Sequence, residues 1–109
     1  MSLLTNYVER FNAAVRSDEW EPMLELVAPD AELEFVGIPV GPFFGRDAIG
    51  EAYRAQPPDD ELVLLDRLDE GSAVYAWAKD PARPAGEVHL EERDGAIARI
   101  RVLYEQFSD

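Results

Sequence analysis

Apolar residues near the start of the chain recur every three or four positions, which is the spacing of a helix with one buried face. This pattern predicts a helix over residues 3–16, with Ser2 as its N-cap. Tyr7 and Ala14 widen the apolar stripe, so the helix is expected to pack on a broad surface such as a sheet. The stripe itself consists of Leu4, Val8, Phe11 and Val15.

A second, shorter apolar face follows at Trp20, Met23, Leu24 and Val27. Asp18 and Glu21 are three residues apart, which resembles a capping pair at the start of a helix. After Pro29-Asp30 the period changes to two, because Ala31, Leu33 and Phe35 alternate with glutamates. This alternation predicts a short strand with one solvated face.

Residues 37–45 contain three glycines and two prolines among apolar residues, so they predict an irregular loop. Phe43 and Phe44 are expected to be buried. A third helix begins near Asp47, whose charge suits a helix N-terminus, and Pro57-Pro58 ends it. Its expected inner face consists of Ala48, Ile49, Ala52 and Tyr53.

The second half of the chain predicts four strands, separated by turn signals and with no helical period between them. Such strands form an antiparallel meander. We therefore expect one α+β domain over residues 1–109, in which a strongly bent, mainly antiparallel sheet wraps over about three N-terminal helices. The predicted strands span residues 61–68, 73–79, 87–93 and 97–107.

The turn at Asp94-Gly95 raises a question of register. A two-residue loop would pair Leu90 with Arg99 and place apolar and charged residues on one face. The apolar pattern therefore predicts a three-residue loop over residues 93–95, with Gly95 in the left-handed region. The predicted pairs are Val88 with Ile100, Leu90 with Ala98, Glu87 with Arg101 and His89 with Arg99.

The composition of the chain argues against several kinds of partner and chemistry. The net charge of −13 opposes binding to nucleic-acid phosphates or anionic membranes, so neither partner is expected. The chain has no cysteine, which removes disulfides and thiolate chemistry. No apolar run is long enough to span a membrane, and no secretory leader is visible, so a cytoplasmic location is expected.

Four short segments, in this order, resemble the nuclear transport factor 2-like superfamily, which includes SnoaL-like polyketide cyclases and ketosteroid isomerases. They are Phe11-Asn12-Ala13 with Asp18-Glu19-Trp20, then residues 26–31, 45–49 and 93–97. The resemblance runs from about Leu4 to Phe107. It implies a cone-shaped barrel with a cavity between sheet and helices, and a single SnoaL-like domain.

The resemblance also implies where ketosteroid isomerases carry their polar groups. A gap-free alignment places Phe35 at the general-base position, Phe11 at the tyrosine position and Val88 at the later aspartate. All three polar atoms are absent, and proton transfer next to a carbonyl requires at least the base. We therefore expect a pocket without ketosteroid isomerase activity.

Other candidate catalytic groups are few. His89, the only histidine, alternates with apolar residues and is expected on the solvated face, so no metal site and no cofactor are predicted. Glu92 shares the parity of Val88 and Leu90 and is a candidate acid or base. Either Asp66 or Arg67 points inward, and the sequence does not decide which. Asp66 and the Tyr104 hydroxyl complete the catalytic candidates.

Three functions remain open at this point. The first is a small-molecule-binding domain that takes a small apolar or ring-shaped molecule in a mainly apolar pocket. The second is a SnoaL-like enzyme of isomerase, cyclase or hydrolase type, and the third is a dimerisation or scaffold domain with a filled cavity. A homodimer is expected through the face that carries Arg99 and Arg101. The predicted pocket consists of Phe11, Trp20, Phe35, Tyr53, Trp77, Leu90, Ile100 and Tyr104.

Overall fold

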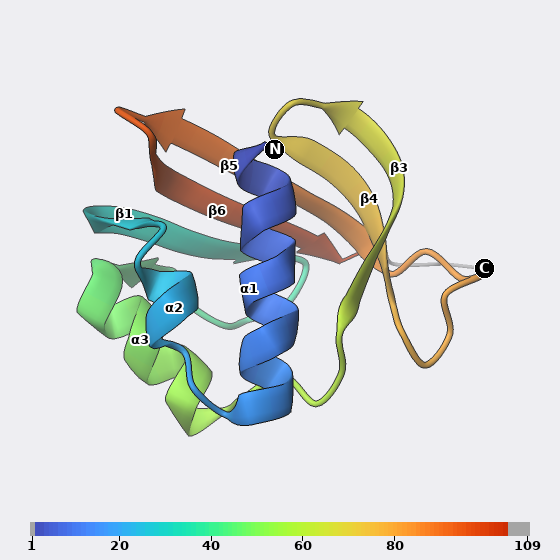
Figure 1. Ribbon diagram of the computed structural model, residues 1–109, viewed down its shortest axis with the longest axis horizontal. Coiled ribbons are helices and arrows are strands. Elements are labelled where there is room, and N and C mark those ends of the chain that lie inside the picture. The colour runs from blue at the N-terminus through green and yellow to red at the C-terminus, as the bar shows by residue number, and fades with distance from the viewer. Residues whose placement is uncertain (1, 105–109) are drawn as a thin grey trace.

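The computed structural model describes residues 2–104, which form three helices and one six-stranded sheet (Figure 1). The last three residues of the strand expected over 97–107 lie outside the described residues. The helices are α1 (Leu3–Ser17), α2 (Glu21–Leu24) and α3 (Arg46–Ala55). The strands are β1 (Val27–Val36), β2 (Phe43–Phe44), β3 (Leu62–Asp69), β4 (Ser72–Trp77), β5 (Gly86–Arg93) and β6 (Ala96–Tyr104).

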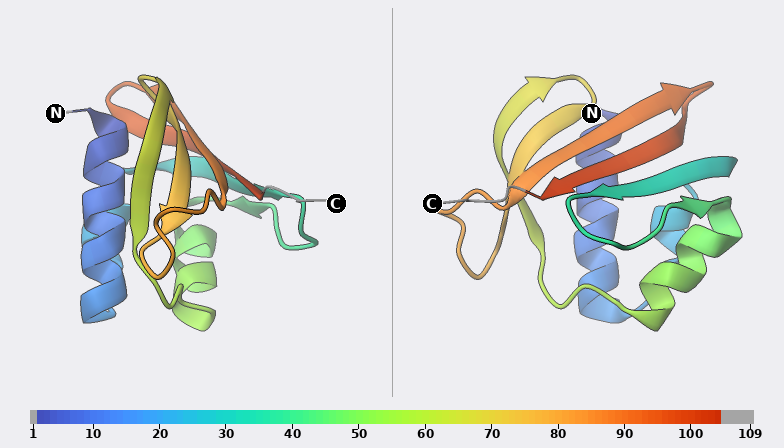
Figure 2. Two further views of the ribbon diagram at one scale, coloured as in Figure 1. Left: turned by 90° about the vertical axis from the view of Figure 1, so that its right-hand side faces the viewer. Right: turned by 180° about the vertical axis from the view of Figure 1, so that it is seen from behind.

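The sheet has the strand order β2-β1-β6-β5-β4-β3. The meander from β3 to β6 is antiparallel throughout, as predicted, and only β1 and β6 run parallel. Helix α1 crosses one face of the sheet in Figure 1, and the view from behind in Figure 2 places the strands in front of it. The α+β class and the bent, mainly antiparallel sheet are therefore confirmed; the sheet is open, with β2 and β3 at its ends.

Helix α1 follows its sequence pattern closely. The Ser2 hydroxyl accepts a hydrogen bond from the Thr5 backbone N–H at 3.1 Å, which caps the helix as predicted. Its buried face consists of Tyr7 and Ala14 with Leu4, Val8 and Phe11 of the expected stripe, whereas Val15 is only partly buried. On its other side, the Asn12 amide bonds both backbone groups of Leu62, at 3.0 Å to the carbonyl and 2.7 Å from the N–H. Helix α1 is thus fixed to the first residue of β3.

The predicted capping pair is wrong. Asp18 is the C-cap of α1, in the left-handed conformation at φ 64°, and its N–H bonds the Ala14 carbonyl. The N-cap of α2 is Trp20, which makes no side-chain capping bond. Aspartate tolerates the left-handed conformation better than most residues, so Asp18 ends one helix instead of starting the next.

Strand β1 begins at Val27, earlier than the Pro29-Asp30 signal indicated, and it is ten residues long. Its pairing with β6 shifts between Val27 and Glu32, so the proline lies in an irregular part of the ladder. The Arg46 Nε donates to the Val27 carbonyl at 2.9 Å and joins the start of α3 to this strand. The predicted inward phase of Ala31 and Leu33 is confirmed, because both are buried.

Phe43 and Phe44 form the short strand β2, which pairs with Leu33 and Glu32 of β1. Phe43 is partly buried, but Phe44 is 67% exposed, so the prediction that both are buried is wrong for Phe44. Successive residues of a strand point to opposite faces, and at β2 the face that carries Phe44 is exposed to solvent.

The predicted register of the β5–β6 hairpin is also wrong. Arg93 pairs with Ala96 across a two-residue turn in which Asp94 and Gly95 both have positive φ, at 54° and 81°. The ladder then skips Ala98, because Glu91 pairs with Arg99 while Glu92 pairs with Ile97. This bulge restores the apolar pairs Leu90–Ile100 and Val88–Val102 without a longer turn.

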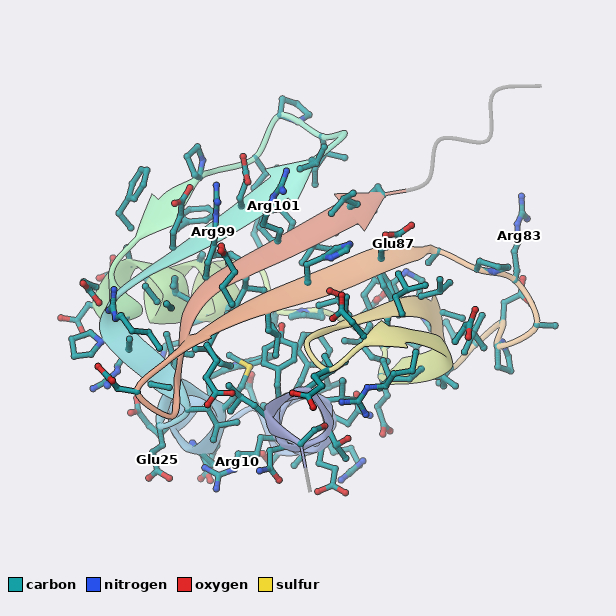
Figure 3. The ribbon with its side chains drawn as sticks, turned by 90° about the horizontal axis from the view of Figure 1, so that it is seen from above. Arg10, Glu25, Arg83, Glu87, Arg99 and Arg101 are labelled. Atoms are coloured by element: carbon teal, nitrogen blue, oxygen red, sulfur yellow. The ribbon has the colours of Figure 1, made fainter. Side chains whose placement is uncertain are left out.

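The new register changes the charge pairs of the outer face, which Figure 3 shows on the side of the sheet away from α1. His89 lies opposite Arg101, not Arg99. Arg99 makes ion pairs with Glu32, Glu34 and Glu91, and Arg101 contacts Glu34 at 2.9 Å. Both arginines therefore find carboxylates within their own chain.

Candidate functional site

A cavity of about 640 Å³ lies between the sheet, α1, α3 and the loop that joins β1 to β2. The sequence contains five Phe, two Trp and four Tyr residues, and eight of these eleven line it. Leu33, Leu62, Val88 and Val102 add aliphatic surface. The aromatic lining consists of Tyr7, Phe11, Phe35, Phe43, Tyr53, Tyr75, Trp77 and Tyr104.

The aromatic rings meet mostly at steep angles. Tyr75 and Trp77 have ring centroids 5.6 Å apart and planes at 83°, and Phe35 meets Phe43 at 6.5 Å and 87°. Edge-to-face pairs of this kind are a favoured packing of aromatic side chains. The rings consequently point in several directions around the space instead of forming one stack.

The cavity opens to solvent between two loops. Ile38, Pro39 and Val40 come from the loop after β1, and Ile38 and Val40 are 36% and 39% exposed. The exposed Asp59 and the segment Gln56–Pro58 come from the connection between α3 and β3. Asp59 is the only residue with a charged side chain in the lining described.

All four tyrosines of the chain line this cavity. The Tyr7 and Tyr53 hydroxyls lie 3.3 Å apart, a long separation for an O–H···O bond. The Tyr75 hydroxyl is buried and has no hydrogen-bond partner among the described residues. The sequence analysis missed Tyr7 and Tyr75 as pocket residues. The sequence signal for these pocket residues was a tyrosine at a position whose neighbours predict burial.

These phenols are neutral at pH 7, and burial raises their pKa values further. Burial raises the pKa of Tyr53 to about 12 and the pKa of Tyr7 well above its usual value, with a further rise from the nearby Tyr53. The pKa values of Tyr75 and Tyr104 are raised for the same reason. At neutral pH the hydroxyls can donate or accept hydrogen bonds, but they are not bases for proton abstraction.

Five of the eight expected pocket residues lie along the cavity, namely Phe11, Phe35, Tyr53, Trp77 and Tyr104. The other three lie outside its lining. Trp20 stacks on Tyr53 with ring centroids 4.8 Å apart, and both residues are buried. Leu90 and Ile100 face each other near the β5–β6 turn, in the solid part of the core. They share the parity of the lining residues but occupy the wrong end of their strands.

The carboxylate candidates lie elsewhere. Glu92 is exposed next to the hairpin turn, and Asp66 is exposed on β3, so neither belongs to the lining. The sequence left open whether Asp66 or Arg67 points inward, and neither residue lines the cavity. Arg67 instead reaches the Ser2 hydroxyl at 2.6 Å. Of the three catalytic candidates, only Tyr104 lies at the cavity.

His89 is also outside the cavity, between Ser72 and Glu87. The Ser72 Oγ lies 2.7 Å from His89 Nδ1, and Glu87 Oε1 lies 2.9 Å from Nε2. The order of groups resembles a nucleophile, base and acid, but Ser72 is only 6% exposed, so a substrate has little access to its oxygen. We read this chain of bonds as one that fixes side chains between β4 and β5.

The three positions that the sequence resemblance assigned to the polar groups of ketosteroid isomerases lie at the cavity. Phe11, Phe35 and Val88 all belong to the lining, so apolar side chains occupy them. Within residues 2–104, the lining contains no histidine, lysine or arginine. The same residues hold no group of three or more His, Asp or Glu side chains placed for a metal ion, and no helix among them could cross a membrane.

Comparison with known proteins agrees with this geometry. The profile of the SnoaL-like domain matches residues 8–105. No curated protein matches the chain at a significant level. Among solved structures, a computationally designed 17-OHP binder is similar, with a TM-score of 0.71 and 15% identity over 96% of this chain and 92% of that one.

Two natural proteins show the same fold. A candidate ketosteroid isomerase from Kribbella flavida has a TM-score of 0.66 and 20% identity over 100% of this chain and 84% of its own. A candidate polyketide cyclase from Sinorhizobium meliloti has a TM-score of 0.59 and 23% identity over 88% and 92% of the two chains. At such identities the likeness concerns the fold alone.

Proposed function

Because the chain belongs to the SnoaL-like domain family, we propose that it is a small-molecule-binding domain whose ligand enters the aromatic cavity. The observation that carries the proposal is an open space of about 640 Å³ with eight aromatic side chains along it. Pockets for small molecules commonly have this size and a mainly apolar lining. The designed 17-OHP binder supports the idea that this fold accommodates ring-shaped ligands.

Burial of apolar surface supplies the driving force. A ligand that loses about 400 Å² of apolar surface gains about 10 kcal/mol at 25 cal/mol per Å². Association costs at least about 4 kcal/mol of that gain. The difference corresponds to a dissociation constant of about tens of micromolar, before any polar contact is added.

Two other functions receive less support. A scaffold domain calls for a filled cavity, whereas Phe11, Phe35 and Trp77 line an open one. An acid–base enzyme calls for a titratable group near neutral pH, whereas the lining of residues 2–104 offers neutral phenols and the exposed Asp59. We therefore expect no proton abstraction from a steroid enone above the buffer rate, and measurable turnover by the pure protein would reject this part.

The proposal is tested by filling the cavity. Ala52 of α3 lines it, whereas Ala13 of α1 is exposed and lies outside its lining, so Ala52→Phe and Ala13→Phe add the same ring inside and outside. Native mass spectrometry identifies any ligand retained from the cell, and titration with ring-shaped apolar compounds is followed by tryptophan fluorescence, to which Trp77 at the cavity and the buried Trp20 both contribute. We expect Ala13→Phe to bind like the parent and Ala52→Phe to lose binding; equal binding by the folded variants would reject the cavity as the site.

We also infer a homodimer, formed through the outer face of β1, β6 and β5. This face carries charges of both signs, with Glu32, Glu34, Arg99 and Arg101 side by side, and such a surface can complement itself across a two-fold axis. Light scattering at micromolar concentration should give twice 12.2 kDa. A mass near 12.2 kDa would reject the dimer, and weakening by salt would assign the contact to the charges.

A further inference from the structure

We propose that the cavity selects organic cations, namely amines or quaternary ammonium compounds that carry apolar groups. This inference rests on the proposed binding function and names the class of ligand. It follows from two features of the lining that area burial alone does not use: the number and arrangement of the aromatic rings, and the sign of the charges around them.

The rings form a partial cage. Neighbouring centroids lie 5.6 Å apart for Tyr75 and Trp77, 6.3 Å for Phe35 and Tyr104, and 6.5 Å for Phe35 and Phe43. A head group that contacts two such neighbouring rings from the open space can lie within about 6 Å of both centroids, which is the range of a cation–π contact. Because the planes of Phe35 and Phe43 meet at 87°, the ring faces along the wall point in different directions. Cages of this kind are known to suit quaternary ammonium groups.

The charges at the cavity also favour a cation. The lining of the described residues contains no Lys, Arg or His side chain that would attract an anion or repel a cation. Asp59 at the mouth is its one carboxylate. Lys79 contacts Asp59 at 3.3 Å, but the side chains are 66% and 90% exposed, so this pair is weak and open to exchange. The net charge of −13 adds a long-range attraction for cations.

The phenols do not change this balance. Tyr7, Tyr53 and Tyr75 are protonated at neutral pH, and burial raises their pKa values further, so their rings act through the negative face of the aromatic system and not through a phenolate. An anion would meet these ring faces and Asp59 without a compensating cation, which is unfavourable. A neutral hydrocarbon ligand would gain from area burial only.

Three compounds of nearly one shape separate these cases. Benzyltrimethylammonium, neopentylbenzene and benzylsulfonate share a benzyl group and a tetrahedral head, with charges of +1, 0 and −1. Area burial alone ranks the neutral compound first, because it loses no hydration of charge. The cage ranks the cation first. Isothermal titration calorimetry, with one cosolvent for all three compounds, measures the order directly.

We expect the cation to bind at least about threefold more tightly than neopentylbenzene, within the range of a desolvated cation–π contact, and benzylsulfonate not to bind. Tighter binding of the neutral compound would overturn the cation inference and leave the binding function intact. Absence of binding by all three compounds would overturn both.

Variants locate the effect. Trp77→Leu keeps an apolar side chain but removes a ring, so it should weaken the cation about fivefold and change the affinity for neopentylbenzene less than about twofold. Asp59→Asn should weaken only the cation, whereas Asp66→Asn removes the same charge from a residue outside the lining and should have a smaller effect. Equal effects of Asp59→Asn and Asp66→Asn would assign the attraction to net charge, and equal losses for both compounds in Trp77→Leu would reject the cage.

Discussion

Replacing Tyr75 with phenylalanine should stabilise the protein, although tyrosine to phenylalanine changes inside a core usually cost stability. The Tyr75 side chain is 1% exposed, and its hydroxyl has no hydrogen-bond partner among residues 2–104. In the unfolded chain the same hydroxyl bonds to water. Folding therefore removes a polar group from water without a protein partner in return, which is unfavourable.

The size of the effect follows from that loss. An unpaired buried polar group costs about 1–3 kcal/mol, and the phenylalanine ring keeps the contact with Trp77 at 5.6 Å. We expect Tyr75→Phe to raise the free energy of unfolding by about 1 kcal/mol, which raises Tm by about 4–8 °C for a domain of this size. Tyr53→Phe is the matched control, because it removes the same atom from the bonded pair Tyr7–Tyr53. It should be neutral or destabilising by up to about 1 kcal/mol.

Urea denaturation of both variants at pH 7, followed by circular dichroism, measures the difference. Equal slopes against urea show that the two unfolding reactions expose similar surface, so the midpoints can be compared. A Tyr75→Phe protein that is less stable than the parent would refute the reasoning. It would mean that the Tyr75 hydroxyl has a partner in solution, such as an ordered water in the cavity.

Three further predictions follow from the fold. Asn12→Ala should lower the free energy of unfolding by about 2 kcal/mol because it breaks both bonds to Leu62, and amide exchange should then be faster at Leu62, whereas Asn6→Ala should leave both unchanged. Gly95→Ala should lower the free energy of unfolding, measured in urea, by about 1 kcal/mol, because φ is 81° at this position. No atom would crowd the added methyl group, so the absence of a loss would mean that the turn changes type. The free energy of unfolding should fall between pH 10 and 12, because the pKa of Tyr53 is raised from 10.0 to about 12. The resulting stabilisation is complete below the unfolded pKa of 10.0 and is lost as pH rises through about 12. Tyrosinate absorbance that appears at pH 10 in the folded protein would contradict this.

Much of the fold could be predicted because it depends on local periodicity. The stripe of α1 and the alternation of Leu33 and Phe35 are repeated over several residues, so single irregularities do not hide them. The hairpin register could not be predicted in the same way. The Asp94-Gly95 turn signal was correct, but a parity argument overruled it, because the bulge at Ala98 is a backbone irregularity that no side-chain pattern reveals.

The site was predictable in its character and less so in its position. Parity shows which face of the sheet a side chain joins, and it groups Phe35 with Leu33 and Tyr104 with Val102, all of which line the cavity. It does not show how far along the strand the solid core ends and the open space begins. Leu90 and Ile100 were therefore placed with the pocket, although their ends of β5 and β6 are closed by packing.

The attachment of α1 to β3 has a consequence for encounters between molecules. The Glu61 carbonyl accepts from Ala78, beside β4, so the N–H and C=O of the next residue, Leu62, point away from the sheet, where a strand of another molecule would bind. The Asn12 amide occupies both groups, and Arg67 holds the other end of β3 to Ser2. Helix α1 thus blocks the β3 edge of the sheet against the addition of a strand from another molecule, which is a common first step of aggregation. Loosening this one helix would free the edge of a strand that already exposes Leu65 and Leu68, so we expect loss of the Asn12 amide to favour edge-to-edge association.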